Sequence, residues 1–421
     1  MSDSFDLVVV GAGPGGIAAA TVAAENGCRV CLLDDNPAVG GQIWRGFQIE
    51  TARKYPHGNG FIDWTVRLQR TRCDVWQGCQ AVDRPASGLL RLERGGEICD
   101  VGFGNLIVAT GARERFLPFP GWTLPGVMGA GGLQALVKGG LDPRGKRIVL
   151  AGSGPLLLAV AAGLASVGAV VAGIYEQAPI SKLAGFALTL LAHPAKLVEG
   201  GRYWLKTMHA PYRTGTWIVH AEGRGRVERV TLRDGRKTWG VECDWLGCGF
   251  HIVPNLELPR LLGCRTVAGY VEVDRLQNTS VARVACVGEL TGIGGLEKAL
   301  VEGQIAGLSA AGRERDALRL VPQRQRLQQF AHRLDRAFAL RSELRTLAQA
   351  NTVVCRCEDV THSALQGCAS WRQAKLHTRC GMGACQGRVC GSATEFLFDW
   401  ENQNTRPPIF PAAVSTLAIK P

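Results

Sequence analysis

The sequence predicts an α/β protein with two dinucleotide-binding, Rossmann-like domains and a small cysteine-rich domain near the C-terminal end. Three observations support this fold class: a glycine turn within residues 8–16, a second glycine turn within residues 147–157, and six cysteines within residues 355–390. Each glycine turn follows an apolar run suited to a buried parallel strand and precedes a run suited to a helix. Such βαβ units are typical of doubly wound sheets.

Length and composition fit a globular, multi-domain protein. The chain has 421 residues, of which 46% are hydrophobic, so we expect two to four domains. The first apolar strand begins within five residues of Met1, which leaves no room for a cleaved export signal, and we expect a cytoplasmic protein. Fifteen cysteines in such a chain favour buried thiols and metal ligands over a disulfide scaffold.

The first glycine turn has every part of a dinucleotide cradle. A strand is expected over 5–10 and a helix over 17–25, with a second strand over 28–33. Glycines in the turn allow a tight bend, close approach of a pyrophosphate and close packing of helix on strand. The acid after the second strand is placed to bind a ribose. The candidate cofactor residues are Gly11, Gly13, Pro14, Gly16 and Asp34.

Three further segments are expected to border the same cofactor. Gly41 and Gln42 follow the ribose-binding acid in a loop whose paired glycines permit close backbone approach. Ala109, Thr110 and Gly111 end a later buried strand in a small-residue turn. Glu289 ends a strand near 282–288 and precedes a glycine-rich helix start, which suits a phosphate or ribityl chain.

The second glycine turn is incomplete. Gly152 and Gly154 match the first two glycines, and Glu176 ends the following strand, but Leu157 stands where a small residue allows close packing. Glu176 favours an unmodified ribose, so ATP or NAD is the expected ligand, and a site kept only for structure is the alternative. We expect Leu157 to hold the helix away from the strand.

Two other stretches bear on membranes and partners. Residues 156–175 carry no charge, but Gly168 splits them, so we expect a buried helix and a parallel strand, not a membrane span. The net charge is +12, and nine arginines lie between Arg313 and Arg345, among apolar residues at helical spacing. This pattern indicates a solvated helix face, or a contact with an acidic partner or the anionic inner membrane surface. Base-stacking aromatics are not interleaved there, so nucleic acid is not expected.

The C-terminal cysteines predict a metal centre. Cys355 and Cys357 form a C-x-C pair, and Cys385 and Cys390 form a C-x4-C pair, so four thiolates can surround zinc or a [2Fe–2S] cluster. Structural zinc usually shows C-x2-C spacing, and a dinucleotide domain upstream favours an electron carrier. Cys380 is a fifth candidate that could replace Cys385 or be a bystander.

Together these motifs resemble flavoproteins of the pyridine nucleotide-disulfide oxidoreductase type. More narrowly, the chain resembles the α-subunits of heteromeric dye-linked dehydrogenases: the A-subunit of opine oxidase, the B-subunit of hydrogen cyanide synthase, and the α-subunits of D-hydroxyproline and proline dehydrogenases. The resemblance implies that FAD binds at the first cradle and that a [2Fe–2S] cluster binds in a ferredoxin-like C-terminal domain. Glu289 departs from the aspartate that related flavoproteins use to hold the ribityl chain. The redox disulfide of the broader relatives is missing, because Cys28 and Cys31 point to opposite faces of a strand.

The resemblance also implies partners and a division of labour. Substrate oxidation is expected on an FAD-bearing β-subunit, with a small γ-subunit, an FMN at a subunit interface, and a quinone or other acceptor downstream. The expected domains are a split FAD-binding domain (1–118 and 245–312), a second nucleotide-binding domain (119–244), a basic helical connector (313–350), the [2Fe–2S] domain (351–400) and a C-terminal tail (401–421).

Three functions are compatible with these patterns. The first is an electron-transfer subunit of a dehydrogenase that oxidises an opine, a D-amino acid or an imino acid. The second is a self-sufficient NADH-dependent flavin and iron–sulfur reductase, which Leu157 disfavours. The third is a nucleotide-binding assembly scaffold whose cysteines hold zinc. The sequence offers no residue for the role of catalytic base.

Overall fold

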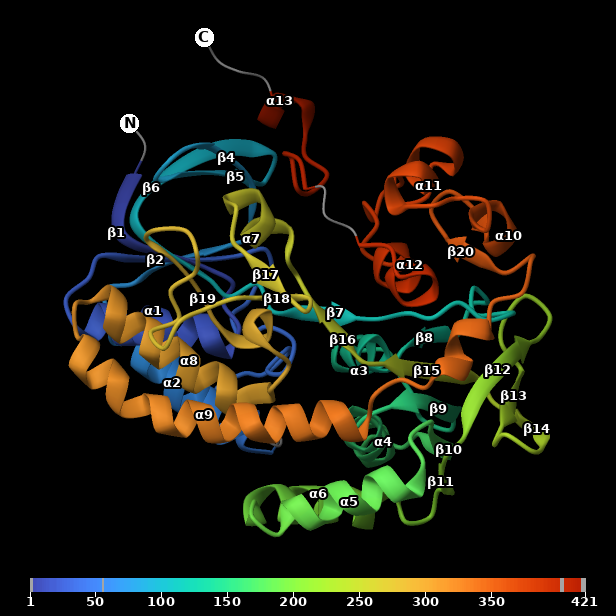
Figure 1. Ribbon diagram of the computed structural model, residues 1–421. Helices are drawn as coiled ribbons and strands as arrows, with labels where there is room; N and C mark the ends of the chain where they lie inside the picture. The colour runs from blue at the N-terminus through green and yellow to red at the C-terminus, as the bar shows by residue number, and fades with distance from the viewer. Residues whose placement is uncertain (1–2, 55–56, 402–404, 418–421) are drawn as a thin grey trace. The chain divides into compact units, whose positions relative to one another are not determined.

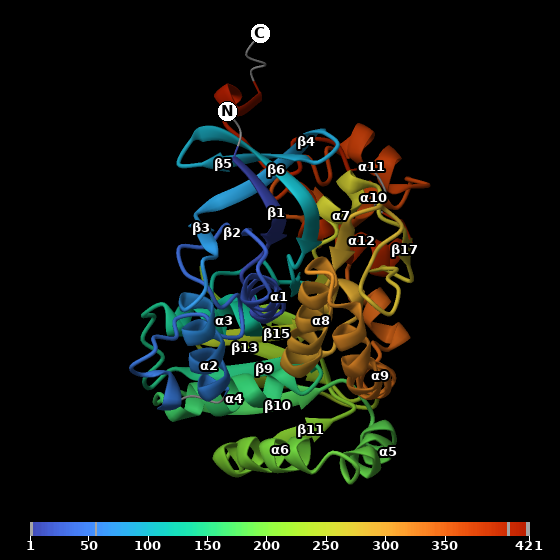
Figure 2. The same ribbon diagram turned by 90° about the vertical axis from the view of Figure 1, so that its left-hand side faces the viewer.

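The computed structural model describes residues 3–54, 57–401 and 405–417, and its contacts divide the chain into two compact units. The first unit holds the described residues of 1–113, 254–332 and 403–421, and the second holds 114–253 and 333–402. Figure 1 and Figure 2 show the elements of both units. The chain therefore leaves and re-enters each unit.

The first unit is built on a seven-stranded sheet in the order β3-β2-β1-β6-β5-β4, with β19 paired to β6. β1 pairs in parallel with β2 and β6, and β4, β5 and β6 form an antiparallel meander. The strands are β1 (Asp3–Val10), β2 (Val30–Asp34), β3 (Asp74–Gln77), β4 (Cys79–Ala86), β5 (Leu89–Arg94), β6 (Glu97–Val108) and β19 (Val284–Cys286). The predicted βαβ opening is confirmed.

Two helices pack side by side against the parallel part of this sheet. α1 (Pro14–Glu25) is rich in glycine and alanine, and α8 (Gly295–Ala310) crosses it (Figure 2). A side chain at Gly303 would collide with the carbonyl oxygen of Gly15, and one at Gly307 would lie 2.5 Å from that of Ala19. Small residues therefore allow the two backbones to approach closely, which fixes the helix N-termini beside the strand ends.

The remaining described elements of the first unit are mostly short. They are η1 (Ala52–Lys54), α2 (Gly58–Gln69), α7 (Glu257–Leu262), β17 (Thr266–Val267), β18 (Tyr270–Val271), η2 (Gly288–Thr291) and α13 (Val414–Leu417). The strands β7 (Ala112–Glu114) and β16 (Ile252–Pro254) pair with each other.

The second unit contains a five-stranded parallel sheet in the order β11-β10-β9-β15-β8. Its strands are β8 (Val127–Gly129), β9 (Arg147–Ser153), β10 (Val170–Glu176), β11 (Tyr212–Thr214) and β15 (Trp245–Phe250). A separate antiparallel sheet contains β12 (Trp217–Glu222), β13 (Arg229–Arg233) and β14 (Thr238–Glu242). The helices of this part are α3 (Ala130–Lys138), α4 (Leu156–Ser166), α5 (Ile180–Leu190) and α6 (Pro194–Thr207).

The position of β15 corrects one prediction. Residues from 245 onward were expected to return the chain to the first domain, but β15 pairs with β9 throughout its length. The strand lies in the interior of the second sheet. Its sequence does not alternate between apolar and polar residues, because both faces of the sheet are covered. The chain leaves the second unit only after β15.

The apolar run 156–175 folds as α4 and β10, as predicted. β10 lies parallel to β9, and Leu157, Val160 and Leu164 of α4 are buried in the core that covers the sheet. Among the described residues, we find no helix with the length and apolar character that crossing a bilayer requires.

The basic segment forms one long helix, α9 (Glu314–Ala337), which contains Pro322. Several of its apolar side chains pack inside the protein: Leu327 packs beside Val321, and Leu334 packs beside Phe338, whereas Leu318 is 46% exposed. Its exposed positions include arginine, glutamine and glutamate side chains. The membrane contact expected of this segment stays a prediction.

The cysteine-rich segment folds around a small core of its own within the second unit. Its elements are η3 (Ser342–Thr346), β20 (Val353–Cys355), β21 (Val360–Thr361), α10 (His362–Leu365), α11 (Trp371–Thr378) and α12 (Cys390–Phe398). Trp371, Leu365 and Trp400 are buried together with three of the cysteines. The cluster residues are therefore held by packing as well as by any metal.

Candidate functional site: two nucleotide cradles and a cysteine cluster

The first cradle lies where the strand order of the first sheet reverses, between the carboxyl ends of β1 and β6. Gly11 has φ +106°, and a side chain there would collide with the carbonyl group of Ala109. A side chain at Gly16 would collide with the carbonyl oxygen of Gly11. Open α/β sheets bind ligands at such a switch point, so the backbone at these two glycines forms part of the wall of the ligand-binding crevice.

The loop after β2 folds back onto this turn. The Gly40 N–H donates to the carbonyl oxygen of Ala12 over 2.8 Å, and a Cβ at Gly41 would lie 2.9 Å from the Cα of Gly13. At Gly13 itself, an added Cβ would have only the Cα of Gly41 within 4 Å, at 3.9 Å. The structure therefore brings the two predicted glycine segments together and leaves room above Gly13.

Asp34 ends β2 beside the same turn. Its carboxylate accepts the Ala12 N–H over 2.5 Å and both the backbone and side-chain N–H groups of Asn36 over 2.8 Å. These bonds fix the carboxylate at the strand end. Its remaining acceptor capacity is what a ribose hydroxyl would use.

The turn after β6 is held by a residue that the sequence did not identify. Asn255 donates from its side chain to the carbonyl oxygen of Thr110 over 2.7 Å, and its backbone N–H donates to Gly111. The Thr110 hydroxyl donates to the Asn255 carbonyl oxygen, and Arg113 donates to the Asn255 side chain over 2.7 Å. No motif marks Asn255, because its role depends on contacts 145 residues away.

Glu289 binds the start of α8. Its two carboxylate oxygens accept the N–H groups of Gly294 and Gly295 over 2.9 and 3.0 Å. Burial is the largest influence on this group and raises its pKa. The carboxylate thus occupies the positive end of the helix, and its contact with a ribityl chain stays a prediction.

Below Glu289 lies a buried charge network that the sequence analysis also missed. Lys298 Nζ donates to Glu302 over 2.9 Å, to Thr291 over 2.8 Å and to the Gly288 carbonyl oxygen over 3.0 Å. Arg324 donates to the other oxygen of Glu302 over 3.3 Å. The network fixes the turn between β19 and α8, because leaving one of these charges unpaired would be costly.

The residues of the first cradle fit an FAD. The glycine turn, the N-terminus of α1 and the acid at the end of β2 have the arrangement that binds an adenosine pyrophosphate. In the loop that faces Gly13, Trp44 Nε1 and Arg45 Nε are buried without a hydrogen-bond acceptor among the described residues. A bound cofactor would supply acceptors of that kind.

The second cradle has the same topology but different chemistry. Its switch point lies between β9 and β15, and Glu176 ends β10. Both Glu176 oxygens are already engaged, by the N–H groups of Gly154 and Ala178 over 2.7 and 2.8 Å. Burial is the main cause that raises the pKa of Glu176 to about 7. The predicted ribose acid is therefore fully buried and bonded within the protein.

A segment after α9 crosses the switch-point crevice. The last residue of β9 and the residues that directly follow β10 and β15 all form hydrogen bonds with this segment. Ser153 Oγ donates to the Phe338 carbonyl oxygen over 2.6 Å, and His251 Nε2 donates to the same oxygen over 2.7 Å. Gln177 donates to the Ala339 carbonyl oxygen over 3.2 Å and accepts from the Arg341 N–H over 3.1 Å. Residues 338–341 thus cross the carboxyl ends of the strands, where open α/β sheets bind their ligands.

Leu157 is accommodated in the core. It is 1% exposed and packs in the same cluster as Ile148 and Leu150, while an added Cβ at Gly249 of β15 would lie 3.0 Å from its Cδ2. Gly249, on the neighbouring strand, leaves room for this side chain. Our expectation that Leu157 holds the helix away from the strand stays a prediction. The start of α4, at Pro155 and Leu156, stays exposed.

The cysteine cluster contains five thiols. The Sγ atoms of Cys355, Cys380 and Cys390 lie within 4.8 Å of one another, and all three residues are buried. Cys385 interacts with Cys390 and with the exposed Cys357. Hydrogen bonds from Cys380 and Cys390 lower the pKa of Cys355 to about 2, and one from Cys390 contributes most to lowering that of Cys385 to about 5.

Cys380 is therefore part of this group of thiols, although its sequence spacing alone left open whether it is a ligand or a bystander. Two spacings are equal, since Cys380 and Cys385, like Cys385 and Cys390, are five positions apart. Only the fold decides which of them face Cys355. The donor set fits a thiolate-ligated centre, because a [2Fe–2S] cluster needs four such sulfurs.

Glycines and one ion pair join the two cysteine segments. A side chain at Gly383 would collide with the Cβ of Cys357, and one at Gly381 would lie 2.6 Å from the Trp371 ring. Arg379 Nε donates to Glu358 over 2.7 Å. The two loops are thus held against each other, and part of the Arg379 charge is offset by Glu358.

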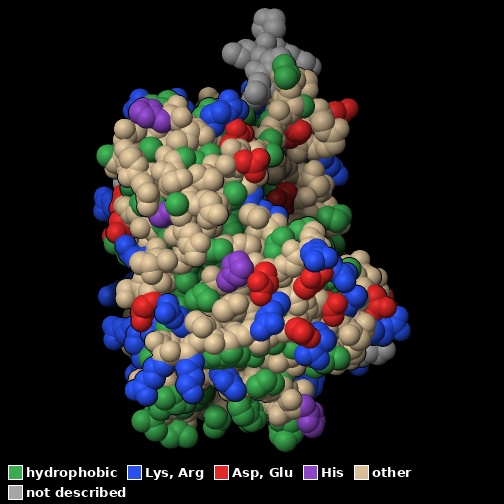
Figure 3. Space-filling view, turned by 90° about the vertical axis from the view of Figure 1, so that its right-hand side faces the viewer, with side chains coloured by type: hydrophobic (Ala, Val, Ile, Leu, Met, Phe, Trp, Pro, Cys, Tyr) green, Lys and Arg blue, Asp and Glu red, His purple; other side chains and the backbone are tan. Residues whose placement is uncertain are grey.

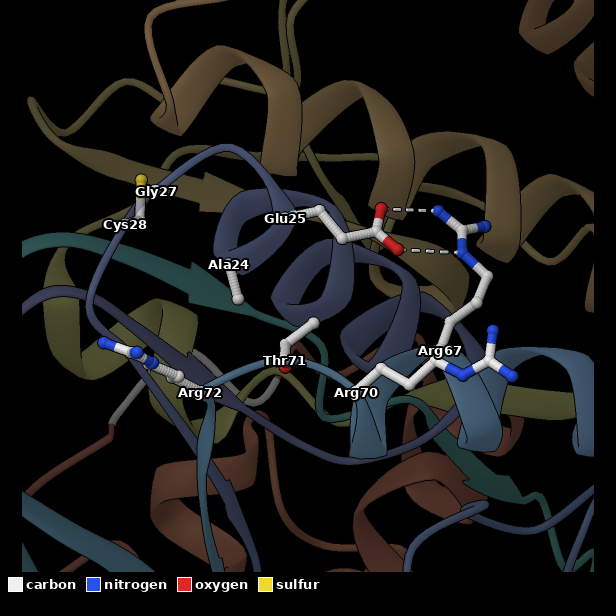
Figure 4. Close-up of a pocket in the computed structure, with 8 residues that line it drawn as sticks. All are labelled: Ala24, Glu25, Gly27, Cys28, Arg67, Arg70, Thr71 and Arg72. Atoms are coloured by element: carbon white, nitrogen blue, oxygen red, sulfur yellow. Dashed lines mark hydrogen bonds and ion pairs between the residues drawn. The ribbon is translucent and has the colours of Figure 1, made fainter.

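Two surface hollows lie away from the cradle turns. One is lined by Arg53, Asn59, Ile62 and Asp63. The other lies at the C-terminal end of α1 and is lined by residues that include Arg67, Arg70 and Arg72, and Arg67 forms a bidentate pair with Glu25 (Figure 4). Neither includes a glycine of the cradle turns.

All fifteen cysteines are free thiols. Cys28 is half-buried and Cys31 is buried, and neither forms a disulfide. The redox disulfide of the broader relatives thus has no counterpart in the only C-x-x-C sequence of the chain.

Comparisons with known proteins agree with this geometry. The family model described as pyridine nucleotide-disulphide oxidoreductase matches residues 5–313. The A-subunit of opine oxidase from Rhizobium meliloti strain 1021 is 34% identical, over 98% of this chain and 98% of that protein. The HcnB subunit of hydrogen cyanide synthase from Pseudomonas aeruginosa is 32% identical, over 91% of this chain and 90% of that protein.

Among solved structures, L-proline dehydrogenase from P. horikoshii superposes with a TM-score of 0.70 at 17% identity. The match covers 99% of this chain and 80% of that one, and at this identity it shows the fold alone. The chain therefore belongs to the pyridine nucleotide-disulphide oxidoreductase family, in the group that includes the A-subunit of opine oxidase and the HcnB subunit of hydrogen cyanide synthase.

Proposed function

We propose that this chain is the flavin- and iron–sulfur-containing electron-transfer subunit of a heteromeric dehydrogenase that oxidises an opine, a D-amino acid or an imino acid on a partner subunit. The observation that carries the proposal is the convergence of Cys355, Cys380 and Cys390, with Cys385 and Cys357 beside them. A flavin-binding cradle and a cluster of thiolates in one chain suit a protein that transfers electrons from a flavin to an iron–sulfur cluster.

FAD would be held at the first cradle, and the chain's own residues have distinct tasks there. Gly13 and the N-terminus of α1 would receive the pyrophosphate, and Asp34 would bind the ribose. Glu289 and the turn fixed by Lys298 would border the ribityl chain. A bound flavin accepts two electrons together and releases them singly, which matches a one-electron cluster.

The cluster would be held by four of the five thiolates, with Cys355, Cys357, Cys385 and Cys390 as the predicted set. The convergence of Cys380 with Cys355 and Cys390 supports Cys380 as a competitor for one of these places. The flanking residues Arg356 and Arg388 carry positive charge, which would favour the reduced cluster.

The crossing at residues 338–341 counts against the NADH-dependent reductase. A nicotinamide would need the crevice that the Phe338 carbonyl oxygen fills. An adenine nucleotide such as ATP, bound at the exposed start of α4, stays a prediction. The zinc scaffold is the remaining alternative, and metal analysis distinguishes it.

Partner subunits are proposed from the relatives, whose names describe subunits of opine oxidase and hydrogen cyanide synthase. A two-electron oxidation of a carbon–nitrogen bond yields an imine, two protons and two electrons. The partner's flavin would take up the electrons, and this chain would relay them to a quinone or another acceptor. A γ-subunit, with an FMN at the interface between subunits, belongs to the same proposal.

The test is anaerobic co-expression of the chain with the subunits encoded beside it. The complex should contain flavin, iron and sulfide, and it should reduce a dye with an opine, a D-amino acid or proline. The same complex with Cys355→Ser should keep flavin reduction by substrate and lose dye reduction. Substrate turnover by the single chain, or zinc without iron in anaerobic protein, would contradict the proposal.

A further inference from the structure

The helical hairpin α5–α6 exposes an unusual amount of apolar surface. α5 has the sequence ISKLAGFALTL, and none of its eleven residues is buried. α6 buries only Thr207. Leu188 and Leu205 are 70% and 65% exposed, and Ile180, Leu191, Trp204 and Met208 are at least half exposed as well. Contiguous apolar surface of this kind marks an interaction site.

The exposed residues form one stripe on each helix. On α5 and the residue that follows it, Ile180, Ala184, Ala187, Leu188 and Leu191 are spaced by four, three, one and three positions. On α6, Leu197, Gly201, Trp204, Leu205 and Met208 repeat the same spacing. Residues at these intervals share one face of a helix, so both helices are amphipathic toward solvent.

The inner faces of both helices are already used. Leu183 and Phe186 of α5 pack against Ala178, Ala337 and Phe338. On α6, which packs against α4, the ring of Trp204 lies edge-on to the ring of Tyr212 at a centroid distance of 5.6 Å, so Trp204 is half-buried. The hairpin is therefore anchored to the second unit, while Leu188, Leu191, Leu205 and Met208 stay mostly exposed.

Positive charge borders the stripes. Residues 180–213 contain five basic side chains and one acidic one, Glu199, and Lys196 pairs with that acid over 3.4 Å. Arg202 and Lys206 lie one helical turn apart, next to Trp204 and Leu205, and Lys182 lies at the start of α5. Figure 3 shows apolar side chains gathered along the lower edge of the molecule, where this hairpin lies, with Lys and Arg side chains beside them.

We propose that the α5–α6 hairpin is a monotopic membrane-docking surface that inserts its apolar stripes into the interface of an anionic phospholipid bilayer. Long basic side chains can reach phosphate groups while their stems stay among apolar groups. Tryptophan is enriched at the level of the headgroups. Neither helix is long enough to cross the hydrocarbon core, so the hairpin lies in the interface.

The charge pattern distinguishes a bilayer from a protein partner. Protein interfaces are depleted in lysine relative to the rest of the surface. A ring of basic groups around an apolar tip instead matches a surface whose negative charge is uniform and fluid, and each basic group adds about 1 kcal/mol of attraction to such a surface. The proposal does not depend on the proposed function, because docking needs neither the flavin nor the cluster.

The test is flotation of the full-length chain with phosphatidylcholine vesicles and with vesicles containing one half phosphatidylglycerol. We expect binding to the anionic vesicles, a blue shift of the tryptophan emission, and weaker binding at high salt. Leu188→Gln and Leu205→Gln should each weaken binding roughly tenfold. Arg202→Gln and Lys206→Gln should each weaken it roughly fivefold.

Leu376→Gln is the matched control, because Leu376 is 70% exposed on α11, outside the hairpin. It should bind vesicles as the unaltered chain does. All variants are checked for unchanged circular dichroism and flavin content. No binding to anionic vesicles by folded protein, or equal loss in Leu376→Gln, would overturn the proposal. It would also be overturned if Leu188→Gln released a protein partner or split an oligomer while the unaltered chain ignored vesicles.

Discussion

The hydroxyl group of Ser153 donates a 2.6 Å hydrogen bond to the carbonyl oxygen of Phe338, across the crevice at the end of β9. The same carbonyl oxygen accepts from His251. Burial is the largest influence on the imidazole and lowers the pKa of His251, so its ring is neutral when it donates. A backbone segment thereby fills the second nucleotide crevice with bonds from two strand ends.

The first prediction follows from this crossing: NADH should not reduce the flavin of the purified chain. Anaerobic stopped-flow mixing should show no stoichiometric bleaching of the flavin band, because the nicotinamide cannot enter the crevice. Dithionite, which needs no site, is the control and should bleach the band fully. Fast reduction by NADH would show that residues 338–341 move aside and would favour the reductase.

The second prediction concerns Gly13. In Gly13→Val, flavin content should fall about tenfold or more, because a side chain would occupy the space left for a pyrophosphate. The variant should still fold, since an added Cβ has only one atom within 4 Å, at 3.9 Å. Flavin absorbance per chain and circular dichroism measure both effects.

Gly200→Val serves as the control for that substitution. An added Cβ at Gly200, on α6, would have no heavy atom within 4 Å. Its flavin content should match that of the unaltered chain. A Gly13→Val protein with full flavin would remove FAD from the first cradle.

The third prediction separates the five clustered cysteines. Substitution of a ligand cysteine by serine should lower the iron content, the sulfide content and the electron paramagnetic resonance signal of the reduced cluster. We expect this loss at four of the five positions, because a dinuclear cluster needs two thiolates per iron. Cys368→Ser is the control, since Cys368 packs against the same small core but lies outside the group of converging thiols. It should keep the signal.

The fifth cysteine is identified by the same series. If Cys380→Ser loses the signal and Cys385→Ser keeps it, Cys380 is the ligand. Five substitutions that all keep the signal, or protein that contains zinc and no iron, would remove the cluster from this domain.

The fourth prediction concerns the pH dependence of stability. Burial raises the pKa of Glu176 to about 7 from an ordinary value of 4.5, so the folded protein binds the proton more tightly than the unfolded chain. This contribution is present below pH 4.5 and is lost as the pH rises through 7. Its size is about 3 kcal/mol.

Urea unfolding of the unaltered chain and of Glu176→Gln between pH 5 and 8 provides the measurement. As the pH rises from 5 to 8, the free energy of unfolding of the unaltered chain should fall by roughly 2 kcal/mol relative to that of Glu176→Gln. Parallel curves for the two proteins would show that Glu176 keeps an ordinary pKa.

The sequence by itself determined the local chemistry of the fold. Gly11, Gly13, Gly16 and Asp34 predicted the first cradle because strand, turn, helix and acid follow one another within 30 residues, where periodicity and glycine spacing are informative. The helix α4 and the parallel strand β10 after it were predicted for the same reason.

Only the tertiary structure decided contacts between distant segments. Whether Cys380 belongs to the cluster depends on how its loop folds around Trp371, because its spacing to Cys385 equals that of Cys385 to Cys390. The space for Leu157 comes from Gly249, on a strand that enters the sheet nearly one hundred residues later. The bonds from Ser153 to Phe338 and from Asn255 to Thr110 likewise join segments 185 and 145 residues apart. Such pairings follow from the packing of whole elements, and no local pattern encodes them.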